Sequence, residues 1–304
     1  MADLRVMATG LRFPEGPVAM ADGSVILGEI AGSAVTRVAP DGRKSAIGSA
    51  GGGPNGLARG PDGALYLCNN GGNEYAEGGF LSTGPSKDYQ CGYIQRIDPH
   101  TGETRILYSQ CGGHKLSAPN DIVFDRQGGF YFTDLGKRRA RDRDHGGLYY
   151  ALPDGSKIVE LVHPMLSPNG VGLSPDEKTV YVADTESSRL FAFDIIEPGK
   201  IKHEPFPAPY GGRCVCGLPG FQRFDSLAVE ASGNICVATL IAGCITVISP
   251  SGQVVRQVKM PDVYPTNICF GGPDLRTAYI TLSASGQLGA MEWPEPGLRL
   301  NFMA

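Results

Sequence analysis

The sequence predicts an all-β fold, a six-bladed β-propeller of four-stranded blades that uses residues 1–304 as a single domain. Three observations support this prediction. A short motif recurs six times, each copy leads into a turn and a β-type run, and no Pro/Ser-rich linker interrupts the series. Repeats of roughly 40–50 residues, each with about four short strands, are typical of propellers, in which one repeat forms one blade.

The recurring motif reads Pro-Asn-Gly or a close relative, then an apolar pair, a turn and an apolar run. Turns such as Asp62-Gly63 suit tight hairpins, and runs such as Thr179-Val180-Tyr181-Val182 have the β-branched and aromatic residues of strands. The 43 glycines and 23 prolines fit a fold with many tight turns. The six copies begin at Pro14, Pro54, Pro119, Pro168, Phe224 and Pro265.

The first three copies predict blades one to three. In blade one, Asp22-Gly23 and Asp41-Gly42 supply two of the hairpin turns. Blade two starts near residue 56 and blade three near residue 122, and each carries an insertion between its second and third strands. The expected strands of blade one are residues 16–20, 24–29, 34–39 and 43–47.

The last three copies predict blades four to six, over residues 171–195, 226–250 and 267–293. A propeller ring also needs a closing strand. Residues 4–8 are apolar enough to supply the outer strand of blade six, and the alternative is residues 298–302. We expect the first, because joining the two ends of the chain adds stability to the ring.

Four long segments are expected to project from the same face of the ring. In a propeller blade, the loop from strand two to strand three lies at the same end as the connection to the next blade. Long loops in a compact domain are usually functional or mobile, so these would wall a pocket. The segments are residues 71–91, 110–118, 135–146 and 197–221.

Composition sets the broad class of the protein. The net charge of −4 gives no reason to invoke nucleic acid or a membrane surface, and no apolar stretch approaches the ~20 residues of a membrane span. The N-terminal residues show no secretory signal, so we expect a cytoplasmic protein. We also expect a monomer or a small homo-oligomer. Most of the eight cysteines lie in apolar runs, which indicates ordinary thiols.

The second residue of each motif is expected to face a common axis. Oxygen-bearing side chains there would suit one hard divalent cation, Ca²⁺ foremost, with Zn²⁺, Mn²⁺, Mg²⁺ and Fe²⁺ as alternatives. The six residues are Glu15, Asn55, Asn120, Asn169, Asp225 and Thr266.

A purely structural explanation competes with this metal site. Asn or Asp at a strand start often accepts a hydrogen bond from its own backbone in an Asx-turn. That explanation is preferred for Asn55 and stays open for Asn120, Asn169 and Asp225. Glu15 favours the site, because Glu forms Asx-turns poorly and a buried unpaired carboxylate is costly.

Four segments resemble the sugar-lactonase family of gluconolactonase, regucalcin (senescence marker protein) and luciferin-regenerating enzyme, over essentially the whole chain. The resemblance implies a propeller with one catalytic divalent ion near the axis. It implies Glu15, Asn169 and Asp225 as metal ligands, with Asn120 touching the metal or the substrate. The related diisopropylfluorophosphatase has the same four-residue pattern around calcium. The segments are Phe13-Pro14-Glu15-Gly16-Pro17, Pro119-Asn120-Asp121, Pro168-Asn169-Gly170 and Asp225-Ser226-Leu227.

The expected activity is metal-dependent opening of a small-molecule lactone, with the ion activating the carbonyl group and the attacking water. Asp225 is the first candidate for the general base, and Asp121 is the second. His114, His145 and His163 fall in or near the predicted loops and could transfer protons. The alternatives are a phosphotriesterase-like or other cyclic ester or amide hydrolase on the same site, and a non-catalytic propeller that binds other proteins.

The segment 137–143 is unusually basic for this mildly acidic chain, with Lys137 and four arginines in seven residues. Arg138 and Arg139 are therefore predicted to bind an acidic group of the substrate, since Arg can hold a carboxylate through two parallel hydrogen bonds. The other explanation is a solvated surface charge run.

Overall fold

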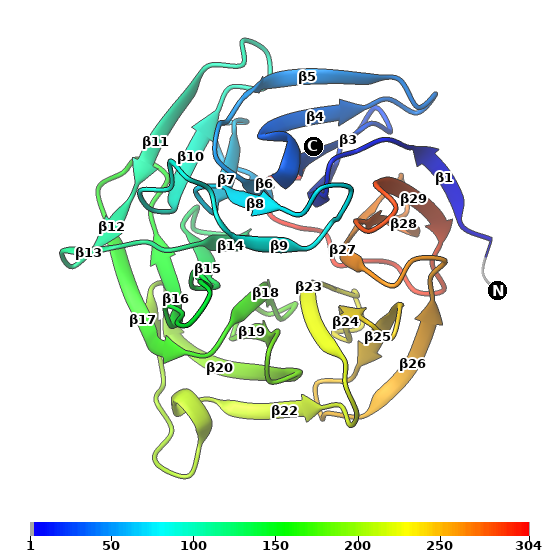
Figure 1. Ribbon diagram of the computed structural model, residues 1–304. Helices are drawn as coiled ribbons and strands as arrows, with labels where there is room; N and C mark the ends of the chain where they lie inside the picture. The colour runs from blue at the N-terminus through cyan, green and yellow to red at the C-terminus, as the bar shows by residue number, and fades with distance from the viewer. Residues whose placement is uncertain (1–2, 304) are drawn as a thin grey trace.

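The computed structural model describes residues 3–303 and confirms the six-bladed all-β architecture. Antiparallel sheets follow one another around a common centre in Figure 1. The predicted domain also includes residues 1, 2 and 304, which lie outside the described residues. Within residues 3–303, no helix combines the length and the apolar character needed to cross a membrane.

In the first three blades the innermost strand comes first in the chain, and each later strand pairs with the one before it. Blade one consists of β2 (Pro14–Ala19), β3 (Val25–Glu29), β4 (Ala34–Val38) and β5 (Lys44–Ser49); blade two of β6 (Pro54–Arg59), β7 (Leu65–Asn69), β10 (Tyr93–Ile97) and β11 (Thr104–Tyr108); and blade three of β14 (Pro119–Phe124), β15 (Phe130–Asp134), β16 (Gly146–Ala151) and β17 (Ile158–Met165).

The last three blades repeat this order, except that blade six takes its outer strand from the N-terminus. Blade four consists of β18 (Pro168–Leu173), β19 (Thr179–Asp184), β20 (Arg189–Glu197) and β22 (Arg213–Gly217), with β21 (Lys200–Ile201) on the end of β20; blade five of β23 (Arg223–Val229), β24 (Ile235–Leu240), β25 (Cys244–Ile248) and β26 (Val254–Lys259); and blade six of β27 (Pro265–Gly271), β28 (Thr277–Leu282), β29 (Gln287–Glu292) and β1 (Arg5–Ala8).

The ring closes as predicted, because β1 pairs with β29 and places Arg5 opposite Ala290. Residues 298–302 do not form a closing strand. Instead they cross one end of the ring, where the Leu298 N–H donates to the Val229 carbonyl at 2.8 Å and the Asn301 amide donates to the Phe124 carbonyl at 3.1 Å.

The prediction that residues 197–221 form a loop was wrong. This segment contains β21, the 3₁₀ helix η2 (Pro209–Gly211) and β22, and β22 pairs with β20 as the fourth strand of blade four. The sequence signal of this strand is the short apolar run Cys214-Val215-Cys216. Blade five likewise extends beyond the predicted residue 250, through β26.

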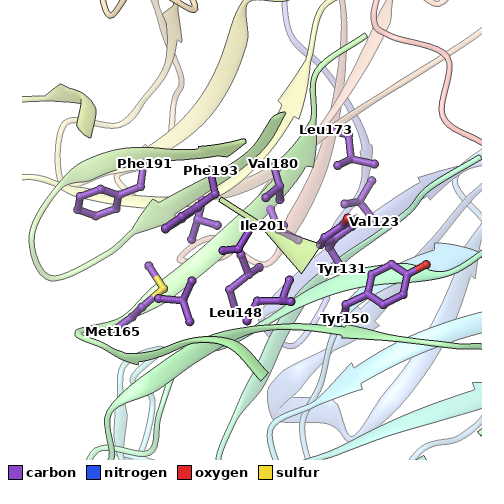
Figure 2. Close-up of a cluster of buried hydrophobic side chains, with 14 residues drawn as sticks. Val123, Tyr131, Leu148, Tyr150, Met165, Leu173, Val180, Phe191, Phe193 and Ile201 are labelled. Atoms are coloured by element: carbon purple, nitrogen blue, oxygen red, sulfur yellow. The ribbon is translucent and has the colours of Figure 1, made fainter. Parts of the chain in front are cut away.

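Apolar contacts between neighbouring blades form the core. Figure 2 shows one such cluster, in which side chains of blade three, such as Val123 and Leu148, meet those of blade four, such as Leu173 and Phe193. Inward-facing residues of both sheets alternate along each strand, so each blade buries its faces against its two neighbours. All eight cysteines are free thiols, as expected.

Three further elements lie outside the blades. They are the 3₁₀ helix η1 (Ile30–Gly32), the hairpin of β8 (Asn73–Tyr75) and β9 (Ser82–Pro85), and the hairpin of β12 (Gln110–Cys111) and β13 (His114–Lys115).

The innermost strands approach each other so closely that several motifs require glycine at their third position. A Cβ atom on Gly56 would lie 2.5 Å from the Asn120 carbonyl oxygen and 2.7 Å from the Asp121 Cα. Both obstacles belong to blade three, and the Asn120 oxygen and the Asp121 Cα are backbone atoms that cannot rotate away.

Gly56→Ala is therefore expected to lower the free energy of unfolding by about 1–3 kcal/mol, because the backbones of blades two and three must separate. Chemical denaturation measures this. The matched control is Gly79→Ala in an exposed turn, where the nearest atoms are the Ala76 Cβ and carbonyl oxygen, both at 3.3 Å, and the expected change is below about 1 kcal/mol. Equal effects of the two substitutions would contradict the close-approach argument.

Candidate functional site

A cavity of about 540 Å³ opens on the face that carries the β8–β9 hairpin, and we call it the upper cavity. Its lining includes five of the six motif residues predicted to face the axis. All five are at least 93% buried, so the strand starts of five blades bring their polar side chains together away from bulk water. They are Glu15, Asn55, Asn120, Asn169 and Asp225.

The sixth motif residue, Thr266, does not line the upper cavity. Its hydroxyl lies within hydrogen-bond distance of the Thr281 hydroxyl at 2.9 Å and the Ser283 hydroxyl at 2.6 Å, and it donates to the Pro14 carbonyl at 3.3 Å. Thr266 therefore joins blade six to blade one rather than facing the cavity.

Glu15 is a buried carboxylate without an ion-pair partner among residues 3–303. One of its oxygens accepts hydrogen bonds from the Gly16 N–H at 3.0 Å and from the Asn267 amide at 3.1 Å. Burial raises its pKa to about 7, although these hydrogen bonds and one from Thr266 oppose the shift. The fold therefore holds this acid where its charged form lacks a counter-charge.

Asp225 faces the same cavity and is also fully enclosed. Burial raises its pKa well above the usual range, and the charge of Glu15 raises it further. The Asn169 side chain opposes this shift as a hydrogen-bond donor. Asn169 is itself held by the Thr185 hydroxyl, which accepts from its amide at 3.1 Å, and by the Ser226 hydroxyl, which donates to its carbonyl oxygen at 3.3 Å.

The side-chain carbonyl oxygens of Asn55 and Asn120 are buried and accept no hydrogen bond within the described part of the chain. An Asx-turn would require these oxygens to accept a backbone N–H, so the structural explanation preferred for Asn55 was wrong. A buried polar atom without a partner costs about 1–3 kcal/mol, which makes two such atoms in one cavity a sign of a missing ligand.

This donor set fits a hard divalent cation. Two carboxylates would neutralise its charge, and amide carbonyl oxygens are ligands that Ca²⁺ accepts readily. A cation would also compensate the two features that are unfavourable without it, the facing negative charges of Glu15 and Asp225 and the unpartnered amide oxygens. No thiol or imidazole among residues 3–303 lines the upper cavity, so softer metals have no preferred ligand there.

The structure places Asp121 away from the upper cavity. Its side chain lines a second cavity of about 230 Å³, the lower cavity, which lies at the end of the ring where residues 298–301 cross. Its two oxygens accept the backbone N–H groups of Ile122 at 3.0 Å and Val171 at 3.2 Å. Successive residues of a strand point to opposite sides, so Asn120 and Asp121 face different cavities.

Arg138 and Arg139 both lie on the wall of the upper cavity, but their surroundings differ. Arg139 forms ion pairs with Asp142 and, at 2.6 Å, with Asp144. Arg138 is exposed and makes no ion pair with the described residues. The positive charge of segment 137–143 is therefore partly neutralised by neighbouring aspartates.

Sequence reasoning missed two charged residues of this wall, Glu186 and Arg223. Glu186 of blade four bridges Arg143 at 3.9 Å and Arg223 at 3.0 Å, and Lys137 is buried rather than solvated. The contacts of Glu186 join residues from different blades, and no local sequence pattern indicates them.

No histidine among residues 3–303 lines the upper cavity, so His114, His145 and His163 are not placed for proton transfer. In contrast, Asp134 and Asp184, which end strands β15 and β19, accept hydrogen bonds from backbone N–H groups. Asp134 accepts the N–H groups of Ser117 and Ala118, and Asp184 accepts that of Ser167, each at 2.6–2.8 Å.

The fold and the site together define a six-bladed propeller with an acidic, amide-rich cavity at its axis. The chain belongs to the family described as the SMP-30/Gluconolactonase/LRE-like region, whose model matches residues 13–284.

Individual relatives agree with this membership. Lactonase drp35 of Staphylococcus saprophyticus is 32% identical over 66% of this chain and 54% of that protein, so the chain spans about half the length of this relative. A solved gluconolactonase of Xanthomonas campestris has a TM-score of 0.74 at 24% identity, covering 96% of this chain and 90% of that one. A calcium-binding regucalcin of Agrobacterium tumefaciens also has 0.74, at 19% identity and 98% coverage of both chains. The two structures share the fold.

Asn120→Leu tests whether the unpartnered amide oxygens are ligands of a cation. Without divalent metal, the variant is expected to be as stable as the parent or up to about 2 kcal/mol more stable, because it removes an unsatisfied polar atom. The extra stability that saturating Ca²⁺ gives should shrink. Thermal and chemical unfolding with Ca²⁺ and with a chelator measure both effects.

The matched control is Asn69→Leu. The side-chain oxygen of this buried Asn accepts the Gly53 N–H at 2.9 Å and the Gly71 N–H at 3.0 Å. Its loss should destabilise the protein equally with and without Ca²⁺. A similar loss of metal-free stability in the Asn120 variant would contradict the cation interpretation.

Proposed function

We propose that this protein is a metal-dependent hydrolase that opens a small-molecule lactone in the upper cavity. The observation that carries the proposal is the pair of buried carboxylates, Glu15 and Asp225, facing the same cavity as three amide side chains. Family membership and the names of lactonase relatives support the reaction class. A propeller that served only for protein contacts would have no use for uncompensated acids buried at its axis.

Glu15, Asn169 and Asp225 would hold the metal ion, with Asn120 as a further ligand or as a contact to a substrate oxygen. Ca²⁺ is the first choice on the chemistry of the donors, and Mg²⁺, Mn²⁺, Fe²⁺ and Zn²⁺ are alternatives. When bound, such an ion polarises an ester carbonyl and lowers the pKa of a coordinated water.

The side chains supply proton transfer and orientation. We assign Asp225 as the general base, because its carboxylate faces the cavity while the Asn169 amide fixes its orientation. Water adds to the lactone carbonyl carbon and gives its proton to Asp225. The ring C–O bond then breaks, and the proton passes to the departing alkoxide, which leaves one hydroxy acid. Asp121, in the lower cavity, would act only by holding the strands of blades three and four together.

The wall of the cavity suggests an acidic substrate. The guanidinium of Arg138 on this wall makes no ion pair with residues 3–303, whereas Arg139 forms ion pairs with Asp142 and Asp144. We infer that Arg138 is the main contact for a substrate carboxylate and that Arg139 contributes less. A lactone that carries a carboxyl group fits this arrangement better than a neutral one.

Metal dependence is tested by stripping the protein with a chelator, checking the metal content by elemental analysis, and measuring proton release over a panel of lactones. Activity should fall to background and return with about one equivalent of added metal per chain. Full activity in metal-free protein would refute the proposal. A phosphotriester belongs in the panel, and turnover of that substrate alone would favour the phosphotriesterase-like alternative.

Arg138→Ala should raise KM for a carboxylated lactone by about tenfold at low salt, since a charge-assisted hydrogen bond contributes roughly 1.5–3 kcal/mol. The KM for a neutral lactone should change little. Arg139→Ala is the matched comparison and should have a smaller effect on the acidic substrate. Equal effects on both substrate classes would reduce this segment to a charged surface.

A further inference from the structure

The β8–β9 hairpin, residues 73–85, crosses the mouth of the upper cavity, and we call it the lid hairpin. It leaves blade two and lies over the centre of the ring in Figure 1. Asn73, Tyr75 and residues 81–84 line the cavity. The hairpin therefore forms part of the enclosure of the site.

Two aromatic contacts fix the far side of the lid hairpin. The Tyr75 ring lies 6.1 Å from the Phe13 ring, next to blade one, and the Phe80 ring meets the Tyr264 ring edge-on at 4.9 Å, next to blade six. Such pairs add an electrostatic attraction between the rings to the burial of their apolar surface. The span from blade two to blades one and six shows that the hairpin bridges the cavity rather than pointing into solvent.

The base of the lid hairpin is held by Lys137, which comes from the insertion of blade three. Its ammonium group donates to the backbone carbonyls of Asn70 at 2.6 Å and Gly72 at 2.7 Å. It also lies 4.6 Å from the centre of the Tyr89 ring. Asn70 and Gly72 precede the hairpin and Tyr89 follows it, so one side chain binds both ends.

This position is demanding for a lysine. The residue is only 3% exposed and has no ion-pair partner among the described residues. Burial lowers its pKa to about 8, although the charges of Asp134 and Asp144 oppose the shift. Two hydrogen bonds and a cation–π contact surround the ammonium group and compensate part of its desolvation.

The other contacts at the base are made by uncharged groups. Gly71 and Gly72 have φ values of +76° and +97°, which suit glycine, and their N–H groups donate to the side-chain oxygens of Asn69 at 3.0 Å and Asn70 at 2.9 Å. Ser86 adds a weaker clasp, since its N–H donates to the Gly72 carbonyl at 3.2 Å and its hydroxyl to the Gly71 carbonyl at 3.3 Å. Lys137 is the strongest of these contacts, because its donor is charged.

We propose that Lys137 is a positioning residue that clamps the lid hairpin over the upper cavity and thereby sets how tightly a substrate is enclosed. The part of this proposal that concerns substrate rests on the proposed function; the clamp itself does not. Lys137 is not a substrate contact, because its donors face two carbonyls and a ring. Arg138, the next residue, has the free donors.

Lys137→Met keeps the length of the side chain and removes the charged donor. Amide hydrogen exchange followed by mass spectrometry should show faster exchange in residues 70–91, by about tenfold or more, with the other blades unchanged. The same variant should raise KM for the best lactone by about tenfold while kcat changes less than about threefold, because the groups that react are untouched.

The matched control is Lys115→Met. Lys115 is exposed and donates to the Gln90 carbonyl at 3.5 Å, at the end of the same insertion but outside the cavity. Exchange and KM should both match the parent protein. Lys137→Gln, which keeps an uncharged donor, should give a smaller increase of the same pattern, and it carries the test if the Met variant does not fold.

Hydrogen exchange needs no substrate, so the clamp is tested even if every lactone proves inert and the proposed function fails. Unchanged exchange in residues 70–91 would overturn the clamp. A uniform rise of exchange in all blades would also overturn it, because Lys137 would then act on global stability. Faster local exchange with an unchanged KM on a turned-over lactone would overturn the link to enclosure.

Discussion

The close approach of the innermost strands around the axis is the constraint on which the site depends. Gly16, Gly56 and Gly170 stand at the third position of their motifs, where a Cβ atom would meet neighbouring backbone at 2.8 Å or less. Because residues adjacent in a strand point to opposite sides, the second-position side chains all point to the same side, and this spacing brings them into one cavity. The acids at the axis are therefore neighbours because glycine lets the blades approach.

That geometry is electrostatically unfavourable for the site when no cation is bound. Glu15 and Asp225 are withdrawn from water together, so burial raises the pKa of both carboxyls, and the charge of Glu15 raises the pKa of Asp225 further. Natural folds keep such strain mainly where function requires it. The same strands also bury the amide oxygens of Asn55 and Asn120 without partners. The carboxylates and the amide oxygens thus both lack a positive partner, and one cation would compensate both.

The sequence predicted what depends on periodicity, namely the six repeats, the strand β1 that closes the ring, and five of the six residues at the axis. It failed where contacts join distant segments. Thr266 shares the repeat position of Glu15 but finds hydroxyl partners within blade six, and no local pattern reveals that choice. Neither explanation of the basic segment predicts that Lys137 is buried, because its partners, Asn70 and Gly72, lie more than sixty residues earlier in the chain.

The basic segment 137–143 shows how the fold can give unlike tasks to like side chains. Lys137 donates hydrogen bonds to backbone carbonyls, Arg139 forms ion pairs with two aspartates, and Arg143 forms an ion pair with Glu186. Arg141 does not reach the cavity. Of these five basic residues, Arg138 is the one on the cavity wall whose guanidinium makes no ion pair with residues 3–303. Selectivity for an acidic substrate in this protein would then depend on a single side chain, while Lys137 holds the enclosure in which it acts.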